Sequence, residues 1–303
     1  MVLSSLFPVF ALILFGSLLK HFRLTNDTFL KTSDKLIYYI FFPALLFWKI
    51  GSSSQNLLSN AGFYIAAVCS VVTIYILSTL YITGFRISHY QAGSFSQSCY
   101  RFNSYIGVAI ILNAFGEDGI GFFGILIGML IPIINVLAVS TLTWFSEKQA
   151  STRVPIGQIA KALVANPLII GCICGLVYAN LKTGFPNFIE NTFKLASSVA
   201  LPLALISIGG ALSLSTMRSH FKLSLVAAVF KLLVLPVTGY IFFKIFGISG
   251  LAFKVGMIFF SLPTSTALYV LSSQLNSDTA LASSSIALST ILSFFSLSIV
   301  LLI

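Results

Sequence analysis

A polar stretch in the middle of an apolar run decides the architecture: residues 100–107 read YRFNSYIG, inside a run that extends over residues 91–115. A second stretch, SLPTST at residues 261–266, interrupts the apolar run 249–275 in the same way. Inside lipid, each unpaired backbone N–H or C=O group is costly, so a helix breaks only where side chains replace the lost hydrogen bonds. Asn, Ser and Thr side chains can do this, and proline obstructs the preceding helical turn. The two stretches therefore predict a pair of interrupted membrane helices.

The composition of the whole chain indicates the same environment. Of its 303 residues, 57% are hydrophobic and only 8% are charged, against about 25% charged residues in an ordinary soluble domain. The mean hydropathy is +1.01. These values exclude a soluble enzyme, a secreted disulfide scaffold and a disordered chain. The net charge of +10 comes from Lys and Arg residues scattered singly between apolar runs, so we expect no nucleic-acid partner.

Ten runs are long enough to cross a membrane, which takes about 20 mainly apolar residues. They are continuously apolar and do not alternate with a period of two, so they predict helices and not the strands of a barrel. The first run is predicted to be a membrane helix and not a signal peptide, because its basic residues follow it. The predicted spans are residues 2–20, 32–50, 59–82, 91–115, 120–143, 158–180, 187–212, 219–243, 249–275 and 279–303.

The second and seventh spans share residues at a constant spacing of 159 positions. Phe29, Lys35, Leu36, Pro43 and Leu46 recur as Phe188, Lys194, Leu195, Pro202 and Leu205. At a spacing of 160, Asp118 recurs as Asp278, and Asn103 aligns with Pro263. Each half then holds five spans, and because five is odd, the second half enters the membrane from the opposite side. We predict two inverted repeats, residues 1–145 and 158–303, joined by a cytoplasmic linker at residues 146–157.

Loop charges predict the orientation. The loops on one side hold ten Lys and Arg residues, and those on the other side hold five. Because the richer side is normally cytoplasmic, both termini are expected to face outward, in a plasma (bacterial inner) membrane.

Two cations fall near span centres, Arg101 in the fourth span and Lys231 in the eighth. An intramembrane cation costs about 2.5–3.5 kcal/mol on insertion scales and usually has a role. All seven acidic residues lie in loops or at span ends, which argues against a cation–proton exchanger and favours an anionic substrate. Two alternatives stay open: Arg101 could snorkel or bond freed carbonyls of the break, and Lys231 could lie nearer an interface if the span boundaries shift.

The candidate substrate-binding residues gather at the two breaks and at these cations. Asn103, Ser104, Thr264 and Ser265 would contact the substrate or stabilise the breaks. We expect no metal or cofactor: the four cysteines lie in apolar runs, and the three histidines, His21, His89 and His220, are expected to be solvated loop residues. The absence of a nucleotide-binding loop argues against ATP coupling. The full set is Arg101, Asn103, Ser104, Tyr105, Lys231, Pro263, Thr264, Ser265 and, in the fifth span, Asn135.

Several pieces of sequence, in this order and spacing, resemble the auxin efflux carrier family of the bile-acid–sodium symporter-like superfamily, in its microbial form. They are RFNSYIG at 101–107, NPLIIG at 166–171, LPLAL at 201–205 with Gly209, Lys231 followed by Pro236, and Pro263 with Thr264. The chain departs from the plant pattern, because it has no Asn-Pro-Asn at the break and no long loop between the fifth and sixth spans.

The resemblance implies an all-α membrane protein in which the broken fourth and ninth of ten helices cross. It implies a scaffold of helices 1, 2, 6 and 7, through which a homodimer could form, and a mobile bundle of helices 3–5 and 8–10. It also implies organic-anion substrates, including auxin in plants and dicarboxylates such as malate or malonate in bacteria. In such proteins the substrate carboxylate binds near the break of the fourth helix, which here is the position of Asn103.

These observations predict a secondary transporter that moves a small organic anion, a carboxylate or dicarboxylate, by alternating access. A channel or a non-transporting membrane sensor on the same fold is the alternative. A membrane enzyme is disfavoured, because the chain has no intramembrane Asp pair, no His-Glu-x-x-His helix and no nucleophile paired with a base.

Overall fold

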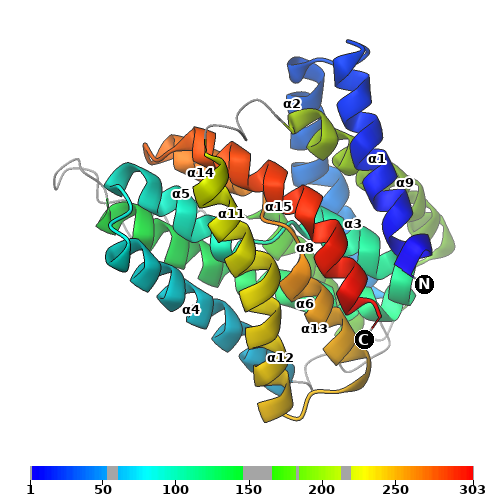
Figure 1. Cartoon of the computed structure of the whole chain (residues 1–303). Helices are drawn as coiled ribbons and strands as arrows, with labels where there is room; N and C mark the ends of the chain where they lie inside the picture. Colours follow the sequence, from blue (N-terminus) through cyan, green and yellow to red (C-terminus); the bar gives the residue numbers. More distant parts are fainter. Residues whose placement is uncertain (1, 53–60, 146–165, 182–183, 213–219, 303) are drawn as a thin grey trace. The chain divides into compact units, whose positions relative to one another are not determined.

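The computed structural model describes residues 2–52, 61–145, 166–181, 184–212 and 220–302, and every regular element in these ranges is helical (Figure 1). The predicted linker at 146–157 and the start of the sixth span, to residue 165, lie outside the described residues. Within these ranges, six helical stretches are long and apolar enough to cross a membrane, and two apolar helices, α8 (Pro167–Asn180) and α13 (Gly250–Ser261), are shorter. The protein is therefore an all-α, multi-pass membrane protein. The ten-helix inverted repeat stays a prediction.

The helices group into two compact units. The first comprises residues 1–60, 105–131 and 160–211, and the second comprises residues 61–104, 132–159 and 212–303. The first unit contains α1 (Val2–His21), α2 (Asp27–Leu36), the π-helix η1 (Ile37–Phe41), α3 (Phe42–Gly51), α8 (Pro167–Asn180) and α9 (Asn187–Ala211). The second contains α4 (Ala61–Gly84), α5 (His89–Tyr100), α11 (Phe221–Val229), the π-helix η3 (Phe230–Val234), α12 (Leu235–Ile245), α13 (Gly250–Ser261), α14 (Ala267–Gln274) and α15 (Thr279–Val300). The predicted scaffold and bundle stay predictions.

The long helix α6 (Ser104–Trp144) lies in the first unit from residue 105 to residue 131 and in the second unit from residue 132 onward. Gly116 interrupts it with φ 64° and ψ −149°, a conformation that is essentially restricted to glycine. This kink lies between the predicted fourth and fifth spans, and the exposed acids Glu117 and Asp118 follow it directly.

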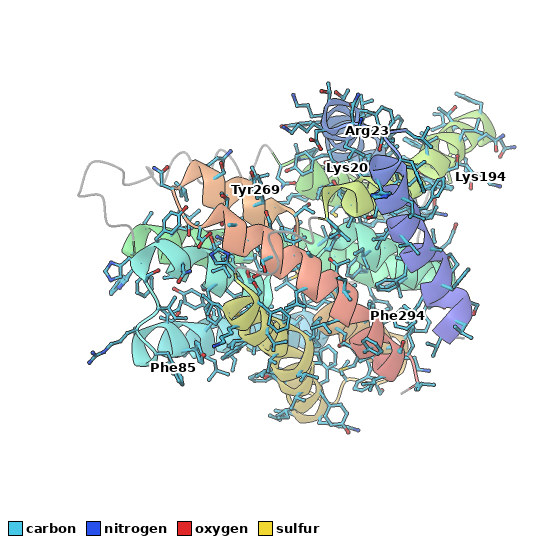
Figure 2. The ribbon with its side chains drawn as sticks, turned by 45° about the horizontal axis from the view of Figure 1, so that its top comes forward. Lys20, Arg23, Phe85, Lys194, Tyr269 and Phe294 are labelled. Atoms are coloured by element: carbon cyan, nitrogen blue, oxygen red, sulfur yellow. The ribbon has the colours of Figure 1, made fainter. Side chains whose placement is uncertain are left out.

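In the first unit, α1 packs against α9, and α3 packs against α8. Glycines allow the α1–α9 approach: a Cβ on Gly209 would overlap the Ile13 carbonyl, and a Cβ on Gly16 would overlap the Ile206 carbonyl. Close backbone approach at small residues is typical of membrane helices, which cannot rely on the hydrophobic effect to associate. Figure 2 shows Lys20 and Arg23 at one end of α1 and Lys194 on α9. The Lys20 ammonium pairs with Asp27 at 2.8 Å.

Large apolar side chains cover the outside of both units. Leu3 and Phe7 on α1 are more than 60% exposed, as is Phe85 after α4, and Phe85 and Tyr269 project outward in Figure 2. So much exposed apolar surface on each unit fits contact with lipid and not with water.

Each π-helix ends two residues before a proline. Pro43 follows η1, and Pro236 follows η3. Proline has no N–H and obstructs the carbonyl four residues earlier, and a π-helical turn accommodates both defects. In η3 that carbonyl belongs to Leu232, and it accepts a hydrogen bond from Ser296 Oγ of α15 at 2.9 Å. The π-helical turn contains Lys231.

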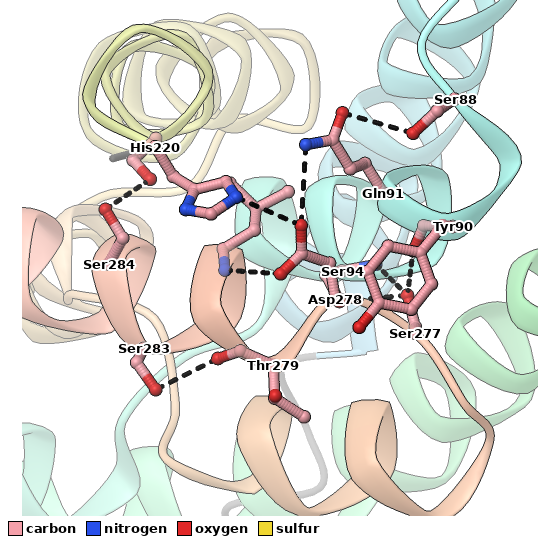
Figure 3. Close-up of polar contacts among 12 residues, drawn as sticks. Ser88, Tyr90, Gln91, Ser94, His220, Ser277, Asp278, Thr279, Ser283 and Ser284 are labelled. Carbon is pink, nitrogen blue, oxygen red and sulfur yellow. Dashed lines mark hydrogen bonds and ion pairs between the residues drawn. The ribbon is translucent and has the colours of Figure 1, made fainter. Parts of the chain in front are cut away.

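A polar cluster joins three helices at one end of the second unit (Figure 3). Asp278 caps α15 by accepting a hydrogen bond from the Leu281 N–H at 2.9 Å. Its other carboxylate oxygen lies 3.2 Å from His220 Nε2 and 3.4 Å from Gln91 Nε2. The prediction that His220 is a solvated loop residue is therefore wrong, because an acid that is distant in sequence lies beside it.

Replacing Asp278 by alanine is expected to lower the free energy of unfolding by about 1–3 kcal/mol, because it removes a helix cap and leaves the buried Leu281 N–H without its acceptor. Asp278→Asn keeps a capping oxygen and should cost less. Thermal unfolding in detergent measures both. Asp118→Ala, at the exposed position matched in the other half of the sequence, is the control and should change the unfolding temperature little. Equal effects of Asp278→Ala and Asp118→Ala would contradict the capping role.

Candidate functional site

The helices are interrupted at both places that the sequence predicts. Helix α5 ends at Tyr100, and Arg101 takes an extended conformation with φ −63° and ψ 152°. Helix α13 ends at Ser261, and Leu262 takes nearly the same conformation, with φ −65° and ψ 148°. The two breaks meet, because the Asn103 N–H donates a hydrogen bond to the Pro263 carbonyl at 2.9 Å. A short polar crossing thus lies inside the second unit.

Side chains satisfy the backbone groups that the breaks release. Ser289 Oγ of α15 accepts a hydrogen bond from the Thr264 N–H at 3.2 Å. Ser265 Oγ accepts one from the Ala267 N–H, at the start of α14, also at 3.2 Å. These bonds replace helical hydrogen bonds that are lost at an interruption in lipid, where water cannot supply the missing partners. Ser289 is a participant that the sequence analysis missed, because it lies far from either break along the chain.

Arg101 is buried at the first break, with 5% of its surface exposed. Its Nε donates a hydrogen bond to Gln97 Oε1 at 2.8 Å, and its terminal nitrogen NH2 donates one to Asn135 Oδ1 at 3.0 Å. Both alternatives for Arg101 are therefore wrong: the side chain does not snorkel, and its bonds go to amide side chains and not to freed carbonyls. Asn135 was a predicted site residue. Gln97 was missed, although it lies one helical turn before Arg101, a spacing that places two side chains together.

Lys231 is fully buried and lies near the middle of the helical stretch Phe221–Ile245. Its Nζ donates a hydrogen bond to the Phe260 carbonyl at 2.9 Å. That carbonyl belongs to the last turn of α13, whose carbonyls lose their helical partners at the break. A cation at a helix C-terminus also interacts favourably with the helix dipole. Lys231 therefore stabilises the second break directly.

An aromatic side chain lies between the two cationic regions. The Phe259 ring packs edge-on against Phe102, the neighbour of Arg101, with ring centroids 4.7 Å apart. Lys231 Nζ lies 6.0 Å from the centre of the same Phe259 ring. The two cations thus belong to one packed region that also contains both breaks.

Two hydroxyl groups in this region are available for hydrogen bonds with a ligand. Ser261 Oγ and Thr264 Oγ1 are buried and have no hydrogen-bond partner among the described residues. Thr264 was a predicted site residue, and Ser261 was not. A buried hydroxyl without a partner is costly, so such groups are suited to a ligand that supplies the missing bonds.

The predicted site residues do not all fall in one unit. Tyr105 lies in the first unit, where its ring packs edge-on against Phe42 with centroids 4.6 Å apart. The others lie in the second unit, with Asn103, Pro263 and Thr264 buried and Ser104 and Ser265 half-buried.

Among the described residues, no acidic side chain neutralises the positive charge of this region. In the described part of the chain the ion pairs are Lys20 with Asp27, Lys49 with Glu117, and His220 with Asp278. Neither Arg101 nor Lys231 pairs with an acidic residue there. The described residues also contain no group of three or more His, Cys, Asp or Glu side chains that could hold a metal ion.

Comparison with known proteins identifies the family. A family model described as membrane transport protein matches residues 146–301, just over half of the chain. An uncharacterized transporter of Methanocaldococcus jannaschii is 24% identical over 290 residues, which cover 93% of this chain and 92% of that protein. The family resemblance that the sequence motifs indicated is confirmed. The chain belongs to the membrane transport protein family, which is the auxin efflux carrier family, and it is a transporter.

Proposed function

We propose that this transporter is a secondary carrier that moves a small organic anion across the membrane by alternating access. The observation that carries the proposal is Arg101, a buried guanidinium at a helix break whose partners in the described residues are neutral amides. A buried charge without a counter-ion is expensive, and an anion that enters from water relieves that cost. The planar guanidinium matches a carboxylate with two parallel hydrogen bonds.

The other polar groups support a carboxylate or dicarboxylate as substrate. Lys231 adds a second positive charge, and Ser261 and Thr264 offer hydroxyl donors at the second break. Asn103 and Ser104, which follow Arg101 closely in the sequence, are also proposed to contact the substrate. The remaining proposed contact residues are Pro263, Ser265 and Asn135.

The architecture that we propose for this carrier has ten membrane helices in two inverted repeats, with both termini outside a plasma membrane. The two predicted repeats would each supply one broken helix, and movement of the bundle that holds the breaks would expose the site to either side in turn. A homodimer through helices 1, 2, 6 and 7 belongs to the same proposal.

Counterflow in liposomes tests the function. Liposomes that contain the purified full chain are loaded with unlabelled malonate or malate, and the entry of labelled malonate is followed. We expect saturable entry that internal dicarboxylate accelerates and that malonamide, the uncharged analogue of malonate, does not inhibit. Liposomes without protein are the control. Ohmic malonate current in a planar bilayer would indicate a channel, and malonate binding without flux would indicate a sensor. Either result would contradict the proposal that the protein is a carrier.

A further inference from the structure

The two amide side chains that hold Arg101 are the feature from which a further role follows. Gln97 lies on α5 and is fully buried, and Asn135 lies on α6 and is half-buried. They accept hydrogen bonds from different nitrogens of one guanidinium, at 2.8 Å and 3.0 Å. Each could be an acid through the exchange of one NH2 group for oxygen, and an acid would bind a guanidinium more strongly. At both positions the chain has a neutral amide, which binds the Arg101 guanidinium more weakly than an acid would.

The amides also determine the direction of the guanidinium. Gln97 Nε2 donates a hydrogen bond to the Gly93 carbonyl at 3.1 Å, so its Oε1 is the atom turned toward Arg101. With Nε and one N–H of NH2 occupied, no acceptor among the described residues bonds the remaining terminal nitrogen, NH1. The two N–H groups of NH1 are therefore available to a substrate carboxylate.

We infer that Gln97 and Asn135 determine the preference for an anion, because they orient the Arg101 guanidinium while leaving its charge and the N–H groups of NH1 for the substrate. The inference rests on the proposed function and adds Gln97 to its residues. Both are positioning residues that act through Arg101. An acid at either position would be a counter-ion inside the protein, and a substrate carboxylate would have to compete with it.

Asn135→Asp is the decisive variant, because it keeps the shape of the side chain and the acceptor oxygen but adds a negative charge. In malonate counterflow we expect the KM of Asn135→Asp to rise at least about tenfold. Asn135→Ala, which removes the hydrogen bond and leaves Arg101 charged, should raise the KM less. A merely structural role predicts the opposite order, because alanine changes the side chain more than aspartate does. Gln97→Glu, which places the acid on the Nε side, should also raise the KM.

The control for added charge is Gln274→Glu, at an exposed position at the end of α14 in the same unit. It should leave the KM for malonate unchanged. Gel filtration and thermal unfolding show which variants are folded, and if Asn135→Asp does not fold, Gln97→Glu gives the same test from the other side of the guanidinium.

The outcomes separate this inference from the function on which it rests. A wild-type protein that gives no counterflow with malonate or malate contradicts the proposed substrate class, and the inference falls with it. Counterflow by the wild type together with an unchanged KM in folded Asn135→Asp and Gln97→Glu overturns the inference alone. A larger effect of Asn135→Ala than of Asn135→Asp also overturns it, because shape and not charge would then be decisive.

Discussion

Arg101→Gln is expected to reduce malonate transport at least about 30-fold while the protein still folds. Removing one member of a buried, hydrogen-bonded charge pair typically costs 2–5 kcal/mol, and about 1.4 kcal/mol corresponds to a factor of ten. Glutamine retains hydrogen-bonding capacity near Gln97 and Asn135 but loses the charge that would attract the substrate. The same change also removes the cost of an uncompensated buried cation, so the unfolding temperature without malonate should not fall much.

Arg101→Lys separates the charge from the geometry of the side chain. Lysine keeps the positive charge but lacks the planar fork, so transport should be intermediate between wild type and Arg101→Gln. Lys254→Gln, which removes an exposed cation from α13 of the same unit, is the matched control and should transport normally. Rates of malonate counterflow, with gel filtration of each variant, provide the measurement. Wild-type transport by Arg101→Gln would remove the basis of the proposed mechanism.

Gly209→Ala is expected to give the largest loss of stability among single methyl additions in the first unit. A Cβ at this position would overlap the Ile13 carbonyl of α1, which is backbone and cannot rotate away. The two helices would have to separate, and overpacking of this kind costs about 1–3 kcal/mol or more. Gly16→Ala should act in the same way, because its Cβ would overlap the Ile206 carbonyl of α9.

The loss of stability expected for Gly209→Ala is opposite in sign to the usual effect of Gly→Ala in a helix. In an unconstrained helix, Gly→Ala raises stability by up to about 1 kcal/mol, since alanine has the higher helix propensity. Gly84→Ala, at the end of α4 where an added Cβ meets nothing within 4 Å, should therefore be neutral or stabilising. The unfolding temperatures of the three variants in detergent provide the comparison. An unchanged or raised unfolding temperature in Gly209→Ala would show that α1 and α9 do not approach as closely as described.

Some features of the site could be predicted because they depend on local chemistry. YRFNSYIG and SLPTST place polar residues and a proline inside apolar runs, and the helices break at both stretches. Arg101 and Lys231 were recognised as exceptional because charges are rare inside membrane spans. The π-helical turns were not predicted, although each is followed by a proline, because a proline is compatible with a kink as well as with a π-helix.

Other features depend on residues that are distant along the chain. Nothing near His220 indicates that Asp278 is its partner, and nothing near Lys231 indicates that the Phe260 carbonyl accepts its hydrogen bond. Ser289 and Ser296 resemble many other serines of this chain, yet each bonds a backbone group beside a break or a proline. Such partners follow from helix packing, which composition and periodicity do not specify in an almost uniformly apolar sequence.

The membrane location, the two interrupted helices and the cation beside one of them could be predicted from the amino-acid sequence, because charges are scarce in it and unpaired backbone is costly in lipid. That the two interruptions meet, and that neutral amides and not acids hold Arg101, became clear from the packing of the helices. Those facts depend on which helices pack together, and in lipid this is decided by close contacts between small residues and by individual polar bonds, not by the hydrophobicity that all the helices share.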